Sequence, residues 1–131
     1  KGAKAVSVGW QPARTECSYW FLRIHVDVSK LRVDKLTFCK AVAAEGLAVN
    51  PAYKAIPADM PWFKERRVFG TPGLPWTAAE YKGRREPQAR LTNAFRAVET
   101  HFNIAMHESF RRKEAADIVK ALRKVEAAYL K

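Results

Sequence analysis

The sequence predicts a two-layer α/β sandwich of the α+β type, in which helices pack on a small, mostly antiparallel sheet. The chain has 131 residues, a length that suits one domain. Apolar residues make up 48% of it and aromatic residues 11%, which is enough to bury a core. Segments with the two-residue period of strands alternate with segments that have the period of helices, and this alternation predicts the layered fold.

The first strand is predicted at residues 18–28. Residues 1–17 show no strong period and are interpreted as an N-terminal connector, whereas residues 18–131 are expected to form a single small domain. Every second residue of the strand is apolar and should face the core. These residues are Trp20, Leu22, Ile24, Val26 and Val28. The residues between them are mixed and should face solvent or a partner.

A helix over residues 33–45 and a second strand near residues 47–49 follow. The helix has an apolar stripe at intervals of three to four residues. The stripe consists of Leu36, Cys39, Val42 and Ala43. Gly46 comes directly after the stripe and is a candidate C-terminal cap, because glycine adopts the left-handed conformation that ends many helices.

Residues 51–87 are predicted to form a long aromatic and proline-rich loop. Six of the seven prolines lie in this stretch, and proline interrupts regular structure. The same stretch contains Trp62, Phe63 and Trp76, so we expect an ordered excursion that packs over the domain or against a partner. Packing is the preferred interpretation for these three rings, and stacking on a ligand is the alternative.

The C-terminal third predicts a helix, a short strand and a last helix. Residues 88–101 have the helical period, and residues 103–106 should form the strand. A turn at residues 107–109 follows, in which Ser109 is a candidate N-cap. Residues 110–129 form the last helix, with one apolar face. That face consists of Ala115, Ile118, Val119, Leu122, Val125 and Tyr129.

Charge and cysteine content narrow the function classes. The chain has 24 basic and 13 acidic residues, a formal net charge of +11. This excess favours an anionic partner, although a basic, solvated surface explains scattered charges equally well. Cys17 and Cys39 lack the spacing of zinc ligands and are expected to be free thiols in a reducing cytoplasm. The sequence has no membrane-spanning run and no visible signal peptide.

Four segments carry a family pattern. They are residues 18–24, residues 33–47 with their AEGL turn, residues 50–63 with Asn-Pro-Ala-Tyr, and residues 104–125. In this order they resemble the C-terminal small domain of DegT/StrS-type PLP-dependent sugar aminotransferases. The third segment keeps a Tyr and a Pro of the family's Tyr-x-Pro-x-His pattern but has no His, so the contacts of that His are not carried over.

The resemblance implies that this chain alone is not a catalyst. In the family, PLP and its Schiff-base lysine belong to a large N-terminal domain, and no segment here resembles the lysine-bearing motif. The chain begins with Lys1 rather than Met, and we expect it to be part of a longer enzyme. Its partners would be the missing N-terminal PLP domain, a second copy in a homodimer, and a keto-sugar, nucleotide-linked or cyclitol-ketone substrate. The domain would help to bind the substrate and to close the cleft.

Three residues are candidates for substrate binding. Tyr53 and Lys54 offer a hydroxyl and an ammonium group that suit sugar or phosphate oxygens. His107 precedes a helix, where backbone N–H groups favour an anion. The alternatives are that Tyr53 packs, that Lys54 is solvated, and that His107 only stabilises its turn. His25 and Asp27 lie on one strand face, and a hydrogen-bonded or exposed pair is preferred to a catalytic or metal-binding one.

Two other functions remain open at this level. A stand-alone small-ligand or protein-binding module with this fold would need no upstream domain. Nucleic-acid binding is the weaker alternative, because the apolar face of the first strand is needed for the core and no RNP-like motif occurs.

Overall fold

The computed structural model describes residues 2–53, 55–70, 73–83 and 90–131. The chain forms two compact units. Residues 1–53 and 97–131 make up the first unit, and residues 54–96 make up the second. The first unit contains the sheet and is described first.

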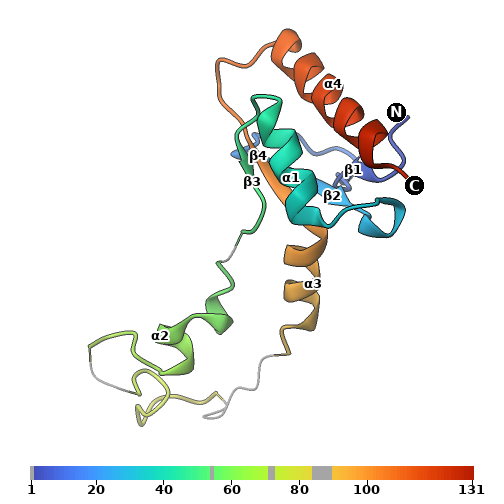
Figure 1. Ribbon diagram of the computed structural model, residues 1–131. Coiled ribbons are helices and arrows are strands. Elements are labelled where there is room, and N and C mark those ends of the chain that lie inside the picture. Colours follow the sequence, from blue (N-terminus) through green and yellow to red (C-terminus); the bar gives the residue numbers. More distant parts are fainter. Residues whose placement is uncertain (1, 54, 71–72, 84–89) are drawn as a thin grey trace. The chain divides into compact units, whose positions relative to one another are not determined.

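The sheet has four antiparallel strands in the order β1-β2-β4-β3 (Figure 1). The strands are β1 (Val6–Val8), β2 (Phe21–Val26), β3 (Val49–Asn50) and β4 (His101–Ala105). The two central strands β2 and β4 are far apart in sequence, and their register places Ile24 opposite Phe102 and His25 opposite His101. The antiparallel sheet confirms the predicted fold class.

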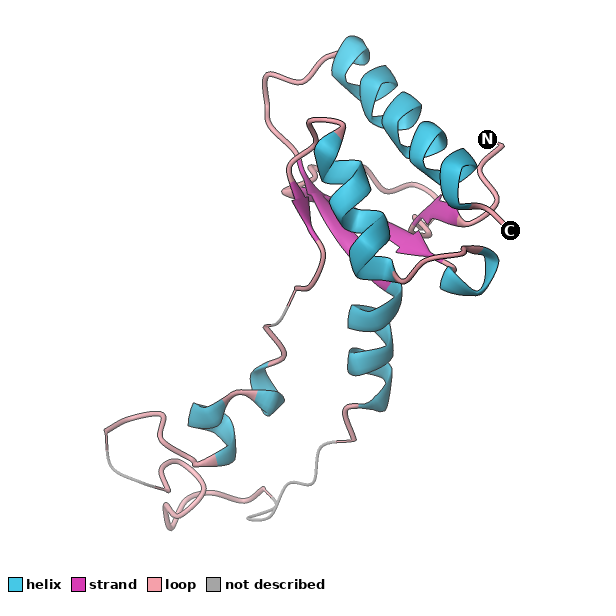
Figure 2. Cartoon of the chain, in the orientation of Figure 1, coloured by secondary structure: helices cyan, strands magenta, loops and turns pink. Residues whose placement is uncertain are grey.

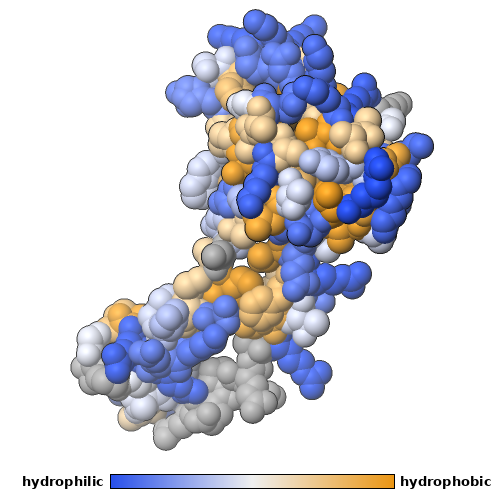
Figure 3. All heavy atoms as spheres, viewed as in Figure 1, coloured by the Kyte–Doolittle hydropathy of each residue, from blue (hydrophilic) through white to orange (hydrophobic). Residues whose placement is uncertain are grey.

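Two helices cover one face of this sheet. They are α1 (Lys35–Ala44) and α4 (Arg112–Tyr129), and Figure 2 shows both on the same side of the strands. The helix α4 turns Ile118, Leu122 and Val125 inward. Hydrophilic side chains gather over its N-terminal end, at the top of Figure 3, as expected for a helix at the surface.

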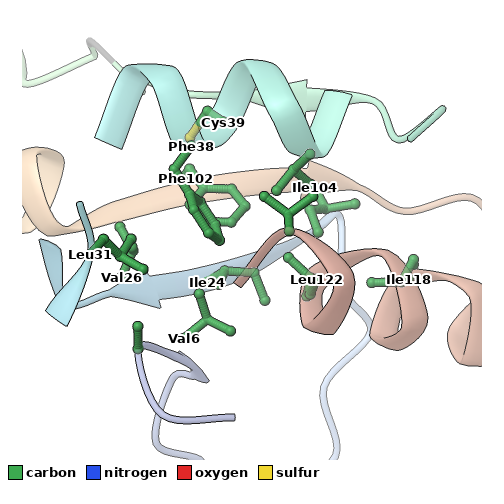
Figure 4. Packing of buried hydrophobic residues seen from close by; sticks show 13 residues of the cluster. Val6, Ile24, Val26, Leu31, Phe38, Cys39, Phe102, Ile104, Ile118 and Leu122 are labelled. Atoms are coloured by element: carbon green, nitrogen blue, oxygen red, sulfur yellow. The ribbon is translucent and has the colours of Figure 1, made fainter. Parts of the chain in front are cut away.

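The hydrophobic core lies between the sheet and these helices (Figure 4). Alternate residues of the central strands point into it, because side chains in a strand alternate between the two faces. The core consists of Ala5, Val6, Ile24, Val26, Leu31, Phe38, Cys39, Val42, Phe102, Ile104, Ile118, Leu122 and Val125. The rings of Phe38 and Phe102 are 6.2 Å apart at its centre.

The predicted first strand is correct in its middle and wrong at its ends. Ile24 and Val26 are buried, as the alternation predicts. Trp20 is 82% exposed and Val28 is 41% exposed, because β2 begins at Phe21 and ends at Val26. Val28 instead starts the short 3-10 helix η1 (Val28–Lys30). The strand alternation therefore does not determine the direction of its side chain.

Residues 1–17 contribute more than the predicted connector. Val6–Val8 form the edge strand β1, and Ala5 and Val6 are buried. The strand is too short to show a period, so the sequence pattern does not reveal it. A single carboxylate oxygen holds this segment: Glu126 Oε1 accepts the backbone N–H groups of Lys4 at 2.9 Å, of Ala5 at 2.5 Å and of Val6 at 3.0 Å.

The helix α1 has a cap at each end. The Asp34 carboxylate accepts the backbone N–H of Thr37 at 2.7 Å, which satisfies one of the free donors of the first turn. At the other end Gly46 adopts a φ of +91° and donates its N–H to the carbonyl of Ala43, which confirms the predicted glycine cap. The predicted stripe is shifted, because Phe38 is buried and Leu36 is half exposed.

We expect the cap at Asp34 to make the stability of the chain depend on pH. The hydrogen bonds from Thr37 lower the pKa of the Asp34 carboxyl below its ordinary value. A lowered pKa in the folded state means that the stabilisation is complete above about pH 4 and is lost as the pH falls through the folded pKa. Asp34→Ala should therefore lower the thermal midpoint at pH 7, whereas Asp34→Asn should retain most of the cap.

The measurement is the thermal midpoint of the three proteins between neutral and strongly acidic pH. The difference between wild type and Asp34→Asn should shrink as the pH falls, because asparagine keeps the acceptor and does not titrate. A difference that stays constant over this range would contradict a role for the charged carboxylate.

The second unit has its own small cluster of aromatic rings. It contains the 3-10 helix η2 (Pro57–Asp59), the short helix α2 (Pro61–Lys64) and the buried Trp76. The ring of Phe63 makes edge-on contacts with Trp62 and Trp76, at centroid distances of 5.7 and 5.5 Å. The burial of Trp76 confirms packing rather than ligand stacking for that ring.

The C-terminal elements are close to their predicted positions. The helix α3 (Thr92–Thr100) lies within the predicted range 88–101, of which residues 88 and 89 are outside the described residues. The strand β4 begins two residues earlier than predicted, directly after α3. The helix α4 has Arg111 as its N-cap rather than Ser109, whose N–H is donated to His107 instead.

Candidate functional site

The sheet has a second face, directed away from α1 and α4, which we call the outer face. It is formed by the residues that alternate with the core residues of β2 and β4. These are Phe21, Arg23, His25, His101, Asn103 and Ala105, of which Asn103 is buried at 5% exposure. Antiparallel sheets commonly carry one covered and one accessible face. Phe21, Arg23 and His25 of the mixed set predicted to face solvent or a partner lie here, whereas Tyr19 and Asp27 of that set lie outside β2.

Three aromatic rings, Trp20, Phe21 and Tyr53, form an aromatic patch at one end of the outer face. The ring centroid of Phe21 is 5.8 Å from that of Trp20 and 5.8 Å from that of Tyr53. The Arg23 guanidinium lies over the Phe21 ring, with its central carbon 5.6 Å from the centroid. Because Trp20 is largely exposed and Tyr53 is 40% exposed, the patch offers apolar area and a cation to a binding partner.

A shallow groove extends the aromatic patch towards the N-terminal segment. Trp10, Gln11, Tyr19, Phe21 and Arg23 are among the residues that line it. The loop between β1 and β2 is held in place by its own hydrogen bonds, in which the side chain of Gln11 donates to the Thr15 carbonyl at 2.7 Å. The groove combines rings with amide and guanidinium groups, a mixture typical of ligand and protein interfaces.

The three predicted substrate residues have different positions. Tyr53 belongs to the aromatic patch, through its contact with Phe21. Lys54 lies outside the described residues. His107 is exposed on the turn before α4, and its ring is 6.4 Å from that of Phe110. Within the described part of the chain, no ring contact or hydrogen bond joins Tyr53 to His107.

The turn at His107 fixes the proton of the imidazole. The backbone N–H of Ser109 is 3.2 Å from His107 Nδ1, and the Ser109 hydroxyl is 2.8 Å from the same atom. An N–H group can only donate, so Nδ1 is the acceptor and the neutral ring carries its proton on Nε2. The free Nε2–H is a hydrogen-bond donor that an oxygen-rich ligand can use.

The helix end next to this turn is already occupied by a side chain. The Glu114 carboxylate accepts the backbone N–H of Arg111 at 2.6 Å. This bond lowers the pKa of the Glu114 carboxyl, so the group is charged at neutral pH. An anionic ligand at the start of α4 would compete with that carboxylate, which weakens the predicted reason for a role of His107.

His25 pairs with His101 rather than with Asp27. The two imidazole rings face each other across β2 and β4, with centroids 5.0 Å apart and planes at 66°. Asp27 turns away and accepts the Ser29 hydroxyl at 2.6 Å, and it forms an ion pair with Lys30 at 3.3 Å. The sequence pattern missed the histidine pair because its members are 76 positions apart and only the strand register joins them.

The environment of His101 favours its neutral form. Burial is the largest cause that lowers the pKa of His101, and the charges of His25, Arg23 and Lys35 lower it further. The bond to the Ala97 carbonyl acts in the opposite direction.

Lys35 does not fit the role of a PLP Schiff-base lysine. Lys35 is half-buried, and burial lowers the pKa of its ammonium group, as a Schiff-base lysine requires. Its Nζ, however, donates to the carbonyls of Val98 and His101 at the end of α3. Lys35 therefore caps a helix, and we assign no step of PLP chemistry to it.

The two cysteines are unpaired, and they differ in environment. Cys17 is exposed and Cys39 is buried in the core. Burial raises the pKa of the Cys39 thiol to about 11, which keeps it protonated at neutral pH. Among the described residues, no group of three or more His, Cys, Asp or Glu side chains is arranged to hold a metal ion.

The chain was compared with family models, curated proteins and solved structures. No family model, no curated protein and no solved structure matches the chain. Within the described residues, none of the helices has the length and apolar character that crossing a bilayer requires.

Proposed function

We propose that the chain is the C-terminal small domain of a PLP-dependent aminotransferase of the DegT/StrS type. In this proposal it acts with a large N-terminal domain that carries PLP and its lysine. It contributes to cleft closure and to the binding of a keto sugar or cyclitol ketone, and the complete enzyme works in the cytoplasm.

The observation that carries the proposal is the asymmetry of the sheet. Both long helices pack on one face, and the other face ends in the aromatic patch beside Arg23. An exposed apolar patch of this kind is typical of a surface that another domain covers. The patch adds a physical reason for a partner.

The proposal gives Tyr53 and His107 separate roles. Tyr53 stands at the edge of the aromatic patch, where the substrate-side loop of the resemblance begins. Its hydroxyl would contact substrate oxygens after the large domain covers the patch. His107 would donate its Nε2–H to the large domain or to the substrate.

The first test concerns the absence of a cofactor lysine. The purified chain is incubated with PLP, and any imine is reduced with borohydride and located by peptide mass spectrometry. We expect only sparse labelling, spread over surface lysines. Stoichiometric labelling of one lysine would contradict the proposal, because the chain would then carry its own cofactor site.

The second test supplies the missing part. The chain is co-expressed with a large PLP-binding domain of the DegT/StrS type as a separate polypeptide. We expect the two to co-purify and to transaminate a keto sugar, which neither does alone. Trp20→Ala should reduce the affinity about tenfold or more, since exposed tryptophans dominate many interfaces.

Val119→Ala is the matched control for this experiment. Val119 is an exposed apolar residue of α4, in the other layer of the sandwich, and its truncation should leave the complex intact. If no large domain of this type binds the wild-type chain, the proposal is wrong and a stand-alone binding module becomes the better interpretation.

A further inference from the structure

We propose that His25 and His101 together form a binding site for a transition-metal ion such as Cu²⁺, Ni²⁺ or Zn²⁺. This site is separate from the aminotransferase proposal and does not depend on it. Three features define the site: the distance between the two rings, the hydrogen bond that orients one of them, and the charges around them.

The spacing of the rings fits a shared metal ion. An ion bonded to one nitrogen of each imidazole at about 2.1 Å lies about 3.2 Å from each ring centroid, and a tetrahedral ligand angle of about 109° puts the centroids about 5.2 Å apart. The observed separation of His25 and His101 is 5.0 Å. The two ring planes meet at 66°, so the rings are not stacked face to face.

The hydrogen bonds of His101 orient its ring as in known metal sites. Its Nδ1 is 3.0 Å from the Ala97 carbonyl oxygen, which can only accept. Nδ1 must therefore carry the proton, and Nε2 carries the lone pair. Histidines that ligate metals usually donate their other N–H to a backbone carbonyl or a carboxylate in this way. The Thr100 hydroxyl, 3.0 Å from Nδ1, adds a second contact at the same atom.

The site is connected to rigid parts of the fold. His25 lies in the central strand β2, and His101 is the first residue of β4, where α3 ends. Lys35 holds this junction by donating to the His101 carbonyl at 3.1 Å. Both imidazoles are only half-buried, so an ion can enter and water can complete its coordination.

The surrounding charges select among metal ions. Arg23 and Lys35 lie close enough to act on His101 electrostatically, and both are cations. They oppose any bound cation, so Ca²⁺ or Mg²⁺, which need several oxygen ligands, should not bind. Ions that bind imidazole strongly can overcome this repulsion, and the affinity should increase towards Cu²⁺. No third His, Cys, Asp or Glu joins the pair in the described part of the chain, so two protein ligands define the site.

The test is an isothermal titration calorimetry experiment at pH 7.5, in which Ni²⁺ or Zn²⁺ alone is titrated into the untagged chain. We expect one ion per chain. His25→Gln and His101→Asn should each weaken binding by about tenfold or more, because each removes one of the two ligands. Asparagine at position 101 keeps a side-chain N–H for the Ala97 carbonyl, so the turn should survive. His107→Gln is the matched control, since it removes an exposed histidine outside the pair, and it should bind as wild type does.

A second measurement needs no variant and so does not depend on their folding. Substoichiometric Cu²⁺ should broaden the imidazole NMR signals of His25 and His101 in the wild-type chain before those of His107. Equal broadening of all three histidines, or binding that the His25 and His101 variants leave unchanged, would overturn the proposal. Stoichiometric binding of Mg²⁺ at the pair would also overturn it, because the geometry argues for nitrogen ligands.

Discussion

Glu126→Ala is expected to lower the free energy of unfolding by about 3–5 kcal/mol, because three backbone N–H donors lose their acceptor. Glu126 is 6% exposed, and one of its carboxylate oxygens accepts three successive backbone N–H groups, those of Lys4, Ala5 and Val6. Alanine would leave these donors without their acceptor in a buried position. Each unsatisfied donor costs about 1–3 kcal/mol unless the segment moves out to water.

In the Glu126→Ala variant, the chain can avoid the unsatisfied donors by releasing its first strand from the sheet. If residues 4–8 leave the sheet, the three donors regain water, but Ala5 and Val6 lose their burial and β2 becomes an edge strand. Hydrogen exchange distinguishes the two outcomes. Release predicts loss of protection in β1 and at Asp27, whose N–H is donated to the Ala5 carbonyl, with less change in β4.

Two further variants make the Glu126 experiment specific. Glu126→Gln keeps one acceptor oxygen but loses the charge, and hydrogen bonds to ionised groups are roughly twice as strong as neutral ones, so we expect about half of the destabilisation. Asp117→Ala removes an exposed carboxylate from the same helix and should change stability by less than about 0.5 kcal/mol. Urea unfolding followed by far-UV circular dichroism measures all three, and equal losses for Glu126→Ala and Asp117→Ala would contradict the buried role.

The sequence alone predicts the parts of the fold that have a period. Strand β2 and helix α4 each contain several apolar residues at regular spacing, and Ile24, Val26, Ile118, Leu122 and Val125 are buried as expected. Ala115 and Val119, which were assigned to the same face of α4, are exposed instead. Local signals also predict the helix end at Gly46. Each of these features depends on residues that are close in sequence.

The features that sequence did not predict depend on contacts between distant residues. Strand β1 has three residues and no visible period, and it is held by Glu126, which lies 120 positions from Val6. The pair of His25 and His101 likewise exists only after β2 and β4 align. Glu126 lies beside the apolar face of the last helix in the sequence. Because a glutamate is rarely buried without a partner, its position could have indicated a contact with another part of the chain.

The candidate site was predicted in part for the same reason. The mixed face of the first strand was expected to face solvent or a partner, and its β2 residues lie on the outer face. Tyr53 was a candidate for substrate binding, and its ring belongs to the aromatic patch. The link between His25 and Asp27 was the local choice, and the structure replaces it with a cross-strand contact.

Phe38→Ala should destabilise the chain by about 3–5 kcal/mol, whereas Leu36→Ala should cost less than about 1 kcal/mol. Phe38 is completely buried against Phe102, and Leu36 is 50% exposed. The helical period at 33–45 assigned Leu36 to the apolar stripe, because residues 36 and 39 are three apart. A buried face that contains Phe38 instead of Leu36 also includes Cys39, so the period alone does not distinguish the two. The bulkier Phe38 settles the rotation of the helix, because its ring buries more apolar area than the leucine side chain.

These two variants form a matched pair within α1. Both replace a large apolar residue with alanine, the best helix former, so differences in helix propensity do not explain a large gap between them. Urea unfolding of the pair measures the gap directly. Equal destabilisation would mean that α1 packs through Leu36 as well, and the core around Phe102 would then have to be reassigned. Repeating both substitutions in a Phe102→Ala background adds a second criterion, because only Phe38→Ala should show a coupling with the ring it contacts.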